Sequence, residues 1–244
     1  MSSTPAEAGR RFRPRLWPTL TALAALAVLL GLGAWQLQRV SWKEALISRA
    51  QAQLRQRAIP LPPTGFEVLD YRRVSARGTY LHNAAFAFGL SASGGEPGAR
   101  LVTPLRLDGG PTILVDRGWL PQRFLPPNVP AGLEPNGLVT IEGVARWRGV
   151  PQRTVLTPTD EPSERRWFSW DVAAIEDALG LPLEPLQIVL ERSGGPSELP
   201  KAQPITVDFA NNHLGYALTW YGLAVVLVVV YTLFSFTQPD IAEP

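Results

Sequence analysis

The sequence predicts a membrane protein in which two transmembrane α-helices flank an α+β outer domain made mostly of antiparallel β-strands. Two long runs without any charged residue, 16–38 and 209–239, predict the helices, because about 20 apolar residues suffice to cross a bilayer. Short runs rich in β-forming residues between them predict the domain. Hydrophobic residues make up 45% of the 244 residues and charged residues 18%, a balance typical of two apolar anchors on one folded domain.

The composition excludes several classes of protein. The absence of cysteine excludes disulfides, thiolate catalysis, cysteine-bound zinc and covalently attached haem. A net charge of +2, without a basic run interleaved with aromatic residues, argues against nucleic-acid binding. The sequence has no phosphate-binding glycine loop, no helix with paired metal-binding histidines and no nucleophile elbow. We therefore expect a protein that is not an enzyme.

Residues 1–15 form a basic N-terminus, which the positive-inside rule places in the cytoplasm. Its cations are Arg10, Arg11, Arg13 and Arg15. A cleaved secretory signal is the competing interpretation, because basic residues precede an apolar core. The uncharged run 16–38 is too long for a signal core, and it leads into Trp35, Gln36, Gln38 and Arg39 without a convincing small-residue cleavage site, so we predict a retained transmembrane helix.

The first helix carries a stripe of small residues that predicts close packing against the second helix. The stripe consists of Ala24, Ala27, Gly31 and Ala34, and we expect its partners to be Ala217 and Ala224. Beyond the span, residues 41–57 should continue as a polar helix.

Trp35, Arg39 and Trp42 share one helical face at the end of the first span. This pattern is typical of an interfacial aromatic belt in which a long arginine reaches toward the headgroups. In the alternative interpretation, Arg39 or Lys43 meets an anionic group beside the second helix. The residue pattern favours the belt.

The outer domain, residues 39–208, opens with a proline-rich linker at 59–65 that cannot be helical. Seven strands are expected, at 71–80, 85–91, 100–107, 112–119, 138–147, 166–170 and 185–191. One helix is predicted at 171–179, because Asp171 can cap its start and Gly180 can end it. This content indicates a sheet or small barrel with helical additions.

Two features of the outer domain are candidate functional residues. His82, the only histidine of this domain, should be a strand or turn residue. The segment Asp116–Trp119 ends a strand, where a local Asp116–Arg117 pair beside a packed tryptophan is the usual explanation. A partner-binding surface is the alternative. Neither feature has a second titratable group suited to acid–base catalysis.

The second helix, 212–236, starts with polar residues and leads to a tail at 237–244 that we place in the cytoplasm. His213, Tyr216 and Trp220 share one face with Ala217 and Ala224. A neutral imidazole is a common ligand of iron and copper, and ionisable residues at membrane depth are often functional. The residue chemistry alone still favours a simpler role, in which His213 hydrogen-bonds a headgroup or a loop carbonyl.

The blocks GAWQLQRVSWKEALI, LVTPLRLDGGPTILVDRGWLP and NNHLGYALTWYGLA together resemble the surfeit locus protein 1 family of cytochrome c oxidase assembly factors. The segment GAWQLQRVSWKEALI is similar to the family's block after the first helix. The segments LVTPLRLDGGPTILVDRGWLP and NNHLGYALTWYGLA are similar to its central block and to the block that opens its second helix. Their order and spacing between two apolar spans extend the resemblance over essentially the whole chain.

The resemblance implies an assembly factor for an aa3-type haem-copper oxidase that binds haem a and assists its insertion into subunit I. It implies that His213 is the axial ligand of the haem iron, with Tyr216, Trp220 and Arg39 around the cofactor. Subunit I, haem a synthase and membrane lipid are the implied partners. The first span starts near Leu16 and leaves no room for the removable presequence of mitochondrial relatives, so we expect the inner membrane of a bacterium, with the central domain in the periplasm.

Two alternatives belong to other classes of protein. The first is a scaffold that stabilises subunit I without binding haem. The second is a membrane enzyme that modifies haem, which the sequence disfavours because it has no cysteine, redox motif or carboxylate–histidine pair.

Overall fold

The computed structural model describes residues 11–12, 14–147, 154–192, 199–202, 204–205, 207 and 212–237. The chain forms two compact units. The terminal segments Met1–Ile47 and Asp208–Pro244 make one unit, and Ser48–Val207 makes the other.

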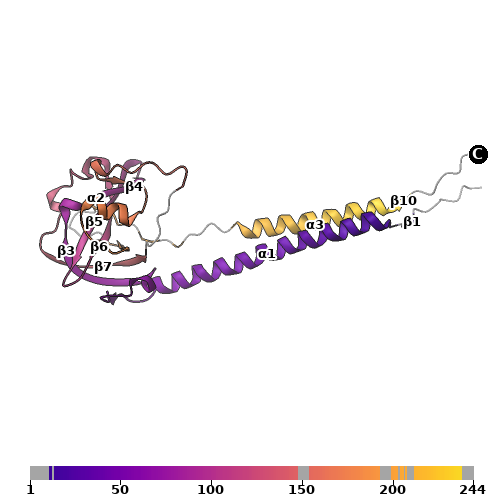
Figure 1. The fold of residues 1–244 in the computed structure, drawn as a ribbon, viewed down its shortest axis with the longest axis horizontal. Coiled ribbons are helices and arrows are strands. Elements are labelled where there is room, and N and C mark those ends of the chain that lie inside the picture. Colours follow the sequence, from indigo (N-terminus) through magenta and orange to yellow (C-terminus); the bar gives the residue numbers. More distant parts are fainter. Residues whose placement is uncertain are drawn as a thin grey trace, which may run out of the picture. The chain divides into compact units, whose positions relative to one another are not determined.

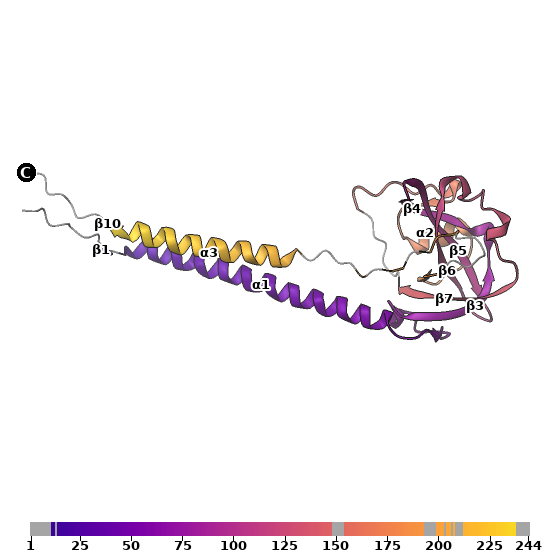
Figure 2. The same ribbon diagram turned by 180° about the vertical axis from the view of Figure 1, so that it is seen from behind.

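The terminal unit is a pair of helices. Helix α1 (Leu16–Leu54) has 39 residues and α3 (His213–Ser235) has 23. The two helices lie side by side in both views (Figure 1 and Figure 2). Beside them, strand β1 (Arg11–Phe12) pairs antiparallel with β10 (Phe236–Thr237). Helix α1 continues through the polar segment as the sequence predicts, because residues 41–54 contain no glycine or proline.

Small residues pack the two helices together, on a different stripe of α1 from the predicted one. Ala217 and Ala224 of α3 are only 1% and 4% exposed, as expected. Within the apolar part of α1, residues 16–38, the buried small residue is Gly33, where an added Cβ would lie 2.7 Å from the ring of Tyr221. The predicted stripe of Ala24, Ala27, Gly31 and Ala34 is exposed, so that prediction is wrong.

The correction has a physical reason. The apolar part of α1 is rich in alanine and glycine on several faces, so small size alone does not select one. Polar contacts mark the face that packs: the Thr19 hydroxyl meets the Tyr231 hydroxyl at 2.5 Å, and Gln36 meets His213. Gly33 lies on that face and leaves room for Tyr221.

Both helices are long and apolar enough to cross a membrane, by length and composition. Only 11% of the most apolar window of each helix is buried inside the structure. Large side chains such as Leu23, Val28, Val225 and Val230 are more than half exposed. Exposed apolar side chains on two helices of this length are consistent with membrane anchoring.

The other unit contains an eight-stranded sheet in the order β2-β3-β7-β9-β6-β5-β4-β8. Its strands are β2 (Ile59–Pro60), β3 (Arg73–Tyr80), β4 (Phe86–Ser93), β5 (Glu96–Leu107), β6 (Thr112–Pro121), β7 (Leu138–Trp147), β8 (Arg166–Trp167) and β9 (Leu186–Leu190). All seven predicted strands are present, and the two-residue β2 within the linker is additional.

Helix α2 (Val172–Leu179) has the predicted caps. The Asp171 carboxylate accepts a hydrogen bond from the backbone N–H of Ala174 at 3.1 Å. Gly180 ends the helix in the left-handed conformation, with φ of 62°. Local chemistry therefore fixes both ends of this helix.

Part of the sheet closes into a five-stranded barrel. Strand β3 pairs with both β7 and β5, so the ring β3–β7–β9–β6–β5 returns to its start. The sheet is mixed, because β9 runs parallel to β6, and β2 and β8 also pair in parallel. The prediction of a mostly antiparallel sheet is thus right only in part. The long path from β6 to β9 through β7, β8 and α2 provides the crossover that parallel pairing requires.

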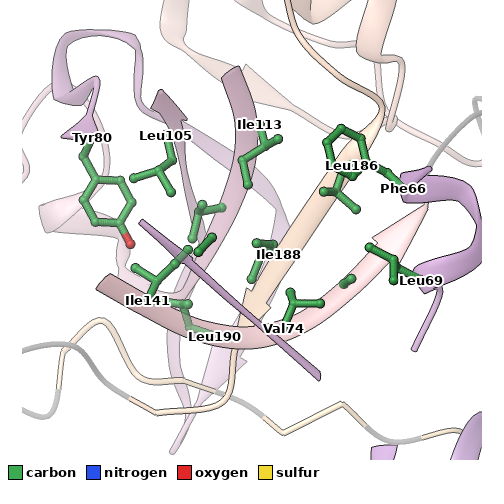
Figure 3. Packing of buried hydrophobic residues seen from close by; sticks show 13 residues of the cluster. Phe66, Leu69, Val74, Tyr80, Leu105, Ile113, Ile141, Leu186, Ile188 and Leu190 are labelled. Carbon is green, nitrogen blue, oxygen red and sulfur yellow. The ribbon is translucent and has the colours of Figure 1, made fainter. Parts of the chain in front are cut away.

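The barrel interior holds the main hydrophobic core (Figure 3). Val74, Leu105, Ile113 and Ile188 are fully buried there. Each such side chain contributes roughly 1.5–3 kcal/mol by leaving water. The 3₁₀ turn η1 (Phe66–Leu69) adds Phe66 and Leu69 to the same cluster. Figure 3 shows Tyr80 at one end of this core, with its hydroxyl toward Ile141.

Candidate functional site

The packed face of the helix pair brings a histidine against an amide. The Nδ1 atom of His213, the first residue of α3, lies 2.8 Å from the Oε1 atom of Gln36 on α1. These residues are 177 positions apart in the chain, and their contact is partly buried. Packing of the two helices therefore holds the imidazole ring at a defined position.

The Gln36 contact determines which nitrogen of His213 is available. The Oε1 atom of Gln36 faces Nδ1, and an amide oxygen only accepts hydrogen bonds, so this contact suits the neutral tautomer that carries its hydrogen on Nδ1 and a lone pair on Nε2. Metal-binding histidines usually have their other nitrogen held in this way, which fixes the tautomer and orientation of the ring. Among the described residues, the ring of His213 has no other hydrogen-bond partner. His213 thus has the chemistry of a single preoriented nitrogen ligand.

The described part of the chain gathers no group of three or more histidine, aspartate or glutamate side chains that could hold a bare metal ion. One imidazole alone cannot fill the coordination sphere of a transition metal. It suits a metal that already has most of its ligands, as haem iron does.

The residues of the predicted face of α3 differ in their surroundings. Ala217 and Ala224 pack against α1, whereas Tyr216 is 57% exposed and Trp220 is half-buried. Tyr216 and Trp220 follow His213 at spacings of three and seven residues, so the three side chains lie on successive turns.

Arg39 lies on α1, one turn beyond Gln36. Its guanidinium stacks over the ring of Trp42, with the central carbon 4.6 Å from the ring centroid. This stack fits the aromatic-belt interpretation, because it holds a cation against an exposed tryptophan. The same position lies about 60° around the helix from Gln36, and Lys43 follows one turn later.

Sequence reasoning missed Gln36 as the partner of His213. A signal was present, because Gln36 and Gln38 are the only amides in the uncharged run 16–38. Only the position of Gly33 on the packed face distinguishes Gln36 from Gln38.

In the outer domain, the prediction of a local pair between Asp116 and Arg117 is wrong. The buried Asp116 carboxylate accepts hydrogen bonds from Arg100 on β5, from Gln187 on β9 and from the N–H of Gly118. Successive residues of a strand point to opposite faces, so Asp116 and Arg117 find separate partners. The packed tryptophan is confirmed, since Trp119 is buried.

Arg117 contacts other residues than Asp116 does, namely Tyr80 and Leu133. Its guanidinium lies 4.9 Å from the centroid of the Tyr80 ring, and its Nη2 donates to the carbonyl of Leu133. Burial lowers the pKa of the Arg117 guanidinium, and the charge of nearby Glu134 partly offsets this. Burial also raises the pKa of Tyr80 to about 12, so its hydroxyl stays protonated at neutral pH.

His82 is a turn residue, as predicted. It starts the 3₁₀ turn η2 (His82–Ala84), and its Nε2 lies 3.0 Å from the carbonyl of Pro135. Its ring also lies 5.6 Å from that of Tyr80. His82 and His213 thus belong to different units of the chain.

These features define a class of protein with two long apolar terminal helices, an imidazole on their packed face and a mixed β-barrel domain between them. Residues 23–225 match the model of the SURF1 family. The chain belongs to this family.

Named relatives support the assignment over most of the chain. A SURF1-like protein of Monosiga brevicollis is 30% identical over 94% of this chain and 91% of its own length. Surfeit locus protein 1 of Xenopus tropicalis is 32% identical over 79% of this chain and 67% of its own length. A SURF1-like protein of Rickettsia felis, a bacterium, is 30% identical over 88% of this chain and 95% of its own length.

Proposed function

We propose that this protein is a membrane-anchored assembly factor for an aa3-type haem-copper oxidase, which binds haem a and assists its insertion into subunit I. Membership of the SURF1 family supports the assembly role. The observation that supports the haem proposal is the His213–Gln36 contact, because it engages Nδ1 of the ring and leaves Nε2 without a hydrogen-bond partner among the described residues.

In this proposal each residue of the site has a separate task. His213 holds the iron through Nε2, and Gln36 keeps the hydrogen on Nδ1. Tyr216 and Trp220 provide aromatic surface beside the imidazole. Arg39, or Lys43 one turn later, neutralises a propionate. When bound, haem supplies an iron that already has its ring nitrogens, so one protein ligand is enough to retain it.

The exposed apolar faces of α1 and α3 support insertion of both helices into a bilayer. The basic N-terminus favours a cytoplasmic location for both termini and a periplasmic location for the central domain. The bacterial inner membrane is the compartment we propose, with membrane lipid around the helices. Haem a synthase is the proposed donor of the cofactor and subunit I the acceptor, and no catalytic step is assigned to the protein itself.

Reporter fusions test this topology. Fusions after Arg57, Gly149 and Pro196 should be active only with a reporter that works outside the cytoplasm. A fusion at the C-terminus should be active only with a cytoplasmic reporter. Cytoplasmic activity of the Gly149 fusion would contradict the proposed placement of the domain.

Deletion of the gene tests the function. Haem a synthesis should remain intact, because a chaperone does not make its cofactor. The aa3-type oxidase should accumulate several-fold less, or with subunit I poorly loaded, and some activity should persist through unassisted loading. Haem a per cell, oxidase content and oxidase activity are the measurements.

Three other outcomes would distinguish the alternatives. Loss of cellular haem a would point to an enzyme of haem synthesis. Unchanged oxidase content, loading and activity would contradict the assembly role. Reduced oxidase together with a purified protein that shows no Soret band would favour the scaffold that does not bind haem.

A further inference from the structure

Among the described residues, the backbone of β7 has an edge without a partner strand beyond the point where β9 ends. Strand β9 ends at Leu190, opposite Gly143 of β7. The preceding part of β7, from Leu138, is paired with β3 alone among the described residues. Antiparallel strands alternate the side to which they hydrogen-bond, and Ala145 bonds toward β3 through Arg72. The N–H and C=O groups of Thr140 therefore point away from β3, toward the open edge.

A cavity of about 860 Å³ lies at this edge. Ile141 and Glu142 of β7 line it together with Leu190 of β9 and Pro200. Its charged lining is three arginines against two glutamates: Arg73, Arg117, Arg192, Glu142 and Glu191. Arg73 is already paired with Glu191, at 2.9 Å between Nε and Oε2. The remaining positive charge favours an anionic occupant.

The deepest arginine of the cavity has unused hydrogen-bonding capacity. Arg117 is only 6% exposed, and its buried Nη1 has no hydrogen-bond partner in the described structure. A buried donor of this kind is costly to leave unpaired. Tyr80 is also among the residues that line the cavity, and its hydroxyl makes no hydrogen bond to a described residue. It remains a donor at neutral pH, because burial raises the pKa of Tyr80 to about 12.

We propose that this cavity binds an extended acidic segment of a partner protein. The segment adds a strand to the open edge of β7 at Thr140, and one of its carboxylates accepts hydrogen bonds from Arg117 Nη1 and the Tyr80 hydroxyl. Two observations favour a peptide over a free carboxylic acid. The cavity is far larger than one carboxylate requires, and the unpaired backbone edge is suited to main-chain hydrogen bonds. The inference is independent of haem binding.

A peptide panel tests this proposal with the full-length protein in detergent. The probes are blocked hexapeptides of alternating threonine and valine, with one glutamate placed at each position in turn, and matched peptides with glutamine. At the correct position, the glutamate peptide should bind at least about tenfold more tightly than its glutamine counterpart, by calorimetry. N-methylation of alternate peptide nitrogens should weaken binding in only one of the two registers, since only one edge of an added strand faces β7.

Variants of the protein test whether Arg117 and Tyr80 bind the carboxylate of the peptide. Arg117→Met should abolish the preference for glutamate, and Tyr80→Phe should weaken glutamate binding several-fold while keeping the ring in the core. Arg77→Met is the matched control and should bind as the wild type does. Arg77 is an exposed arginine of the same strand as Tyr80, 3.8 Å from Asp108. The melting temperature of Arg117→Met should not fall, because the change removes a buried cation that is incompletely hydrogen-bonded.

Several results would overturn the proposal. Equal binding of the glutamate and glutamine peptides at every position would exclude a carboxylate site. If Arg117→Met still preferred glutamate over glutamine, Arg117 would be excluded as the residue that binds the carboxylate. Full competition by acetate at concentrations near those of the peptides would indicate a site for free carboxylates instead. If Arg117→Met does not fold, Tyr80→Phe decides the question, because it removes only one oxygen atom.

Discussion

Replacement of His213 by alanine is expected to remove most of the haem that copurifies with the protein from a host that makes haem a. The change deletes the only histidine of α3, which is the proposed ligand, and alanine preserves the helix. The measurement is the Soret absorbance per protein. His82→Ala is the matched control and should retain haem near the wild-type level, because His82 lies in a turn of the outer domain.

Two further variants should cause smaller losses of haem. Gln36→Leu should weaken haem retention about 10- to 100-fold, the usual effect of losing the group that orients a metal-binding histidine. Trp220→Ala should give an intermediate loss, because it removes aromatic surface and keeps the ligand. Stoichiometric haem in the His213→Ala protein would exclude His213 as the ligand, although it would not exclude an assembly role.

Replacement of Gly118 by alanine should strongly destabilise the β-barrel domain. Gly118 has φ of 114°, and an added Cβ would lie 2.5 Å from the carbonyl oxygen of Lys201. That segment cannot move away freely, since Trp119 and Lys201 exchange two backbone hydrogen bonds of 2.9 and 2.8 Å. We expect a loss of about 3 kcal/mol in the free energy of unfolding, since strain and overlap act together. The melting temperature should fall by about 6–12 °C.

Gly132→Ala is the matched control for this variant. Gly132 has no heavy atom within 4 Å of an added Cβ, and it has no positive φ. Its replacement should change stability by no more than about 0.5 kcal/mol. Thermal unfolding followed by tryptophan fluorescence measures both variants. Equal melting temperatures for the two would mean that the backbone around Gly118 can relax, and that its close approach to Lys201 is not required for stability.

The sequence by itself determined the helices and the main strands of this protein. The apolar runs and the uninterrupted polar segment after the first run define α1 and α3, and alternation between turn residues defines the strands. Asp171 and Gly180 fix the ends of α2. These features depend on residues that are only a few positions apart in the chain. The order of residues in the sequence is therefore enough to predict them.

The sequence determined the candidate haem site only in part. Helical periodicity placed His213 on a face with Ala217 and Ala224, and both alanines are buried. It did not identify Gln36, and it selected the wrong stripe of α1. Several faces of α1 carry small residues, so the periodicity of one helix cannot show which face its partner meets.

Only the tertiary structure decided the closure of the barrel and the surroundings of Arg117. Strand β3 pairs with β5 as well as β7, and parallel β9 lies between β6 and β7. This arrangement sends Asp116 to Arg100 and Arg117 to Tyr80, although the two residues are adjacent in the chain. The physical reason is that strand alternation assigns neighbours to opposite faces, while the partners on each face come from strands far away in the sequence.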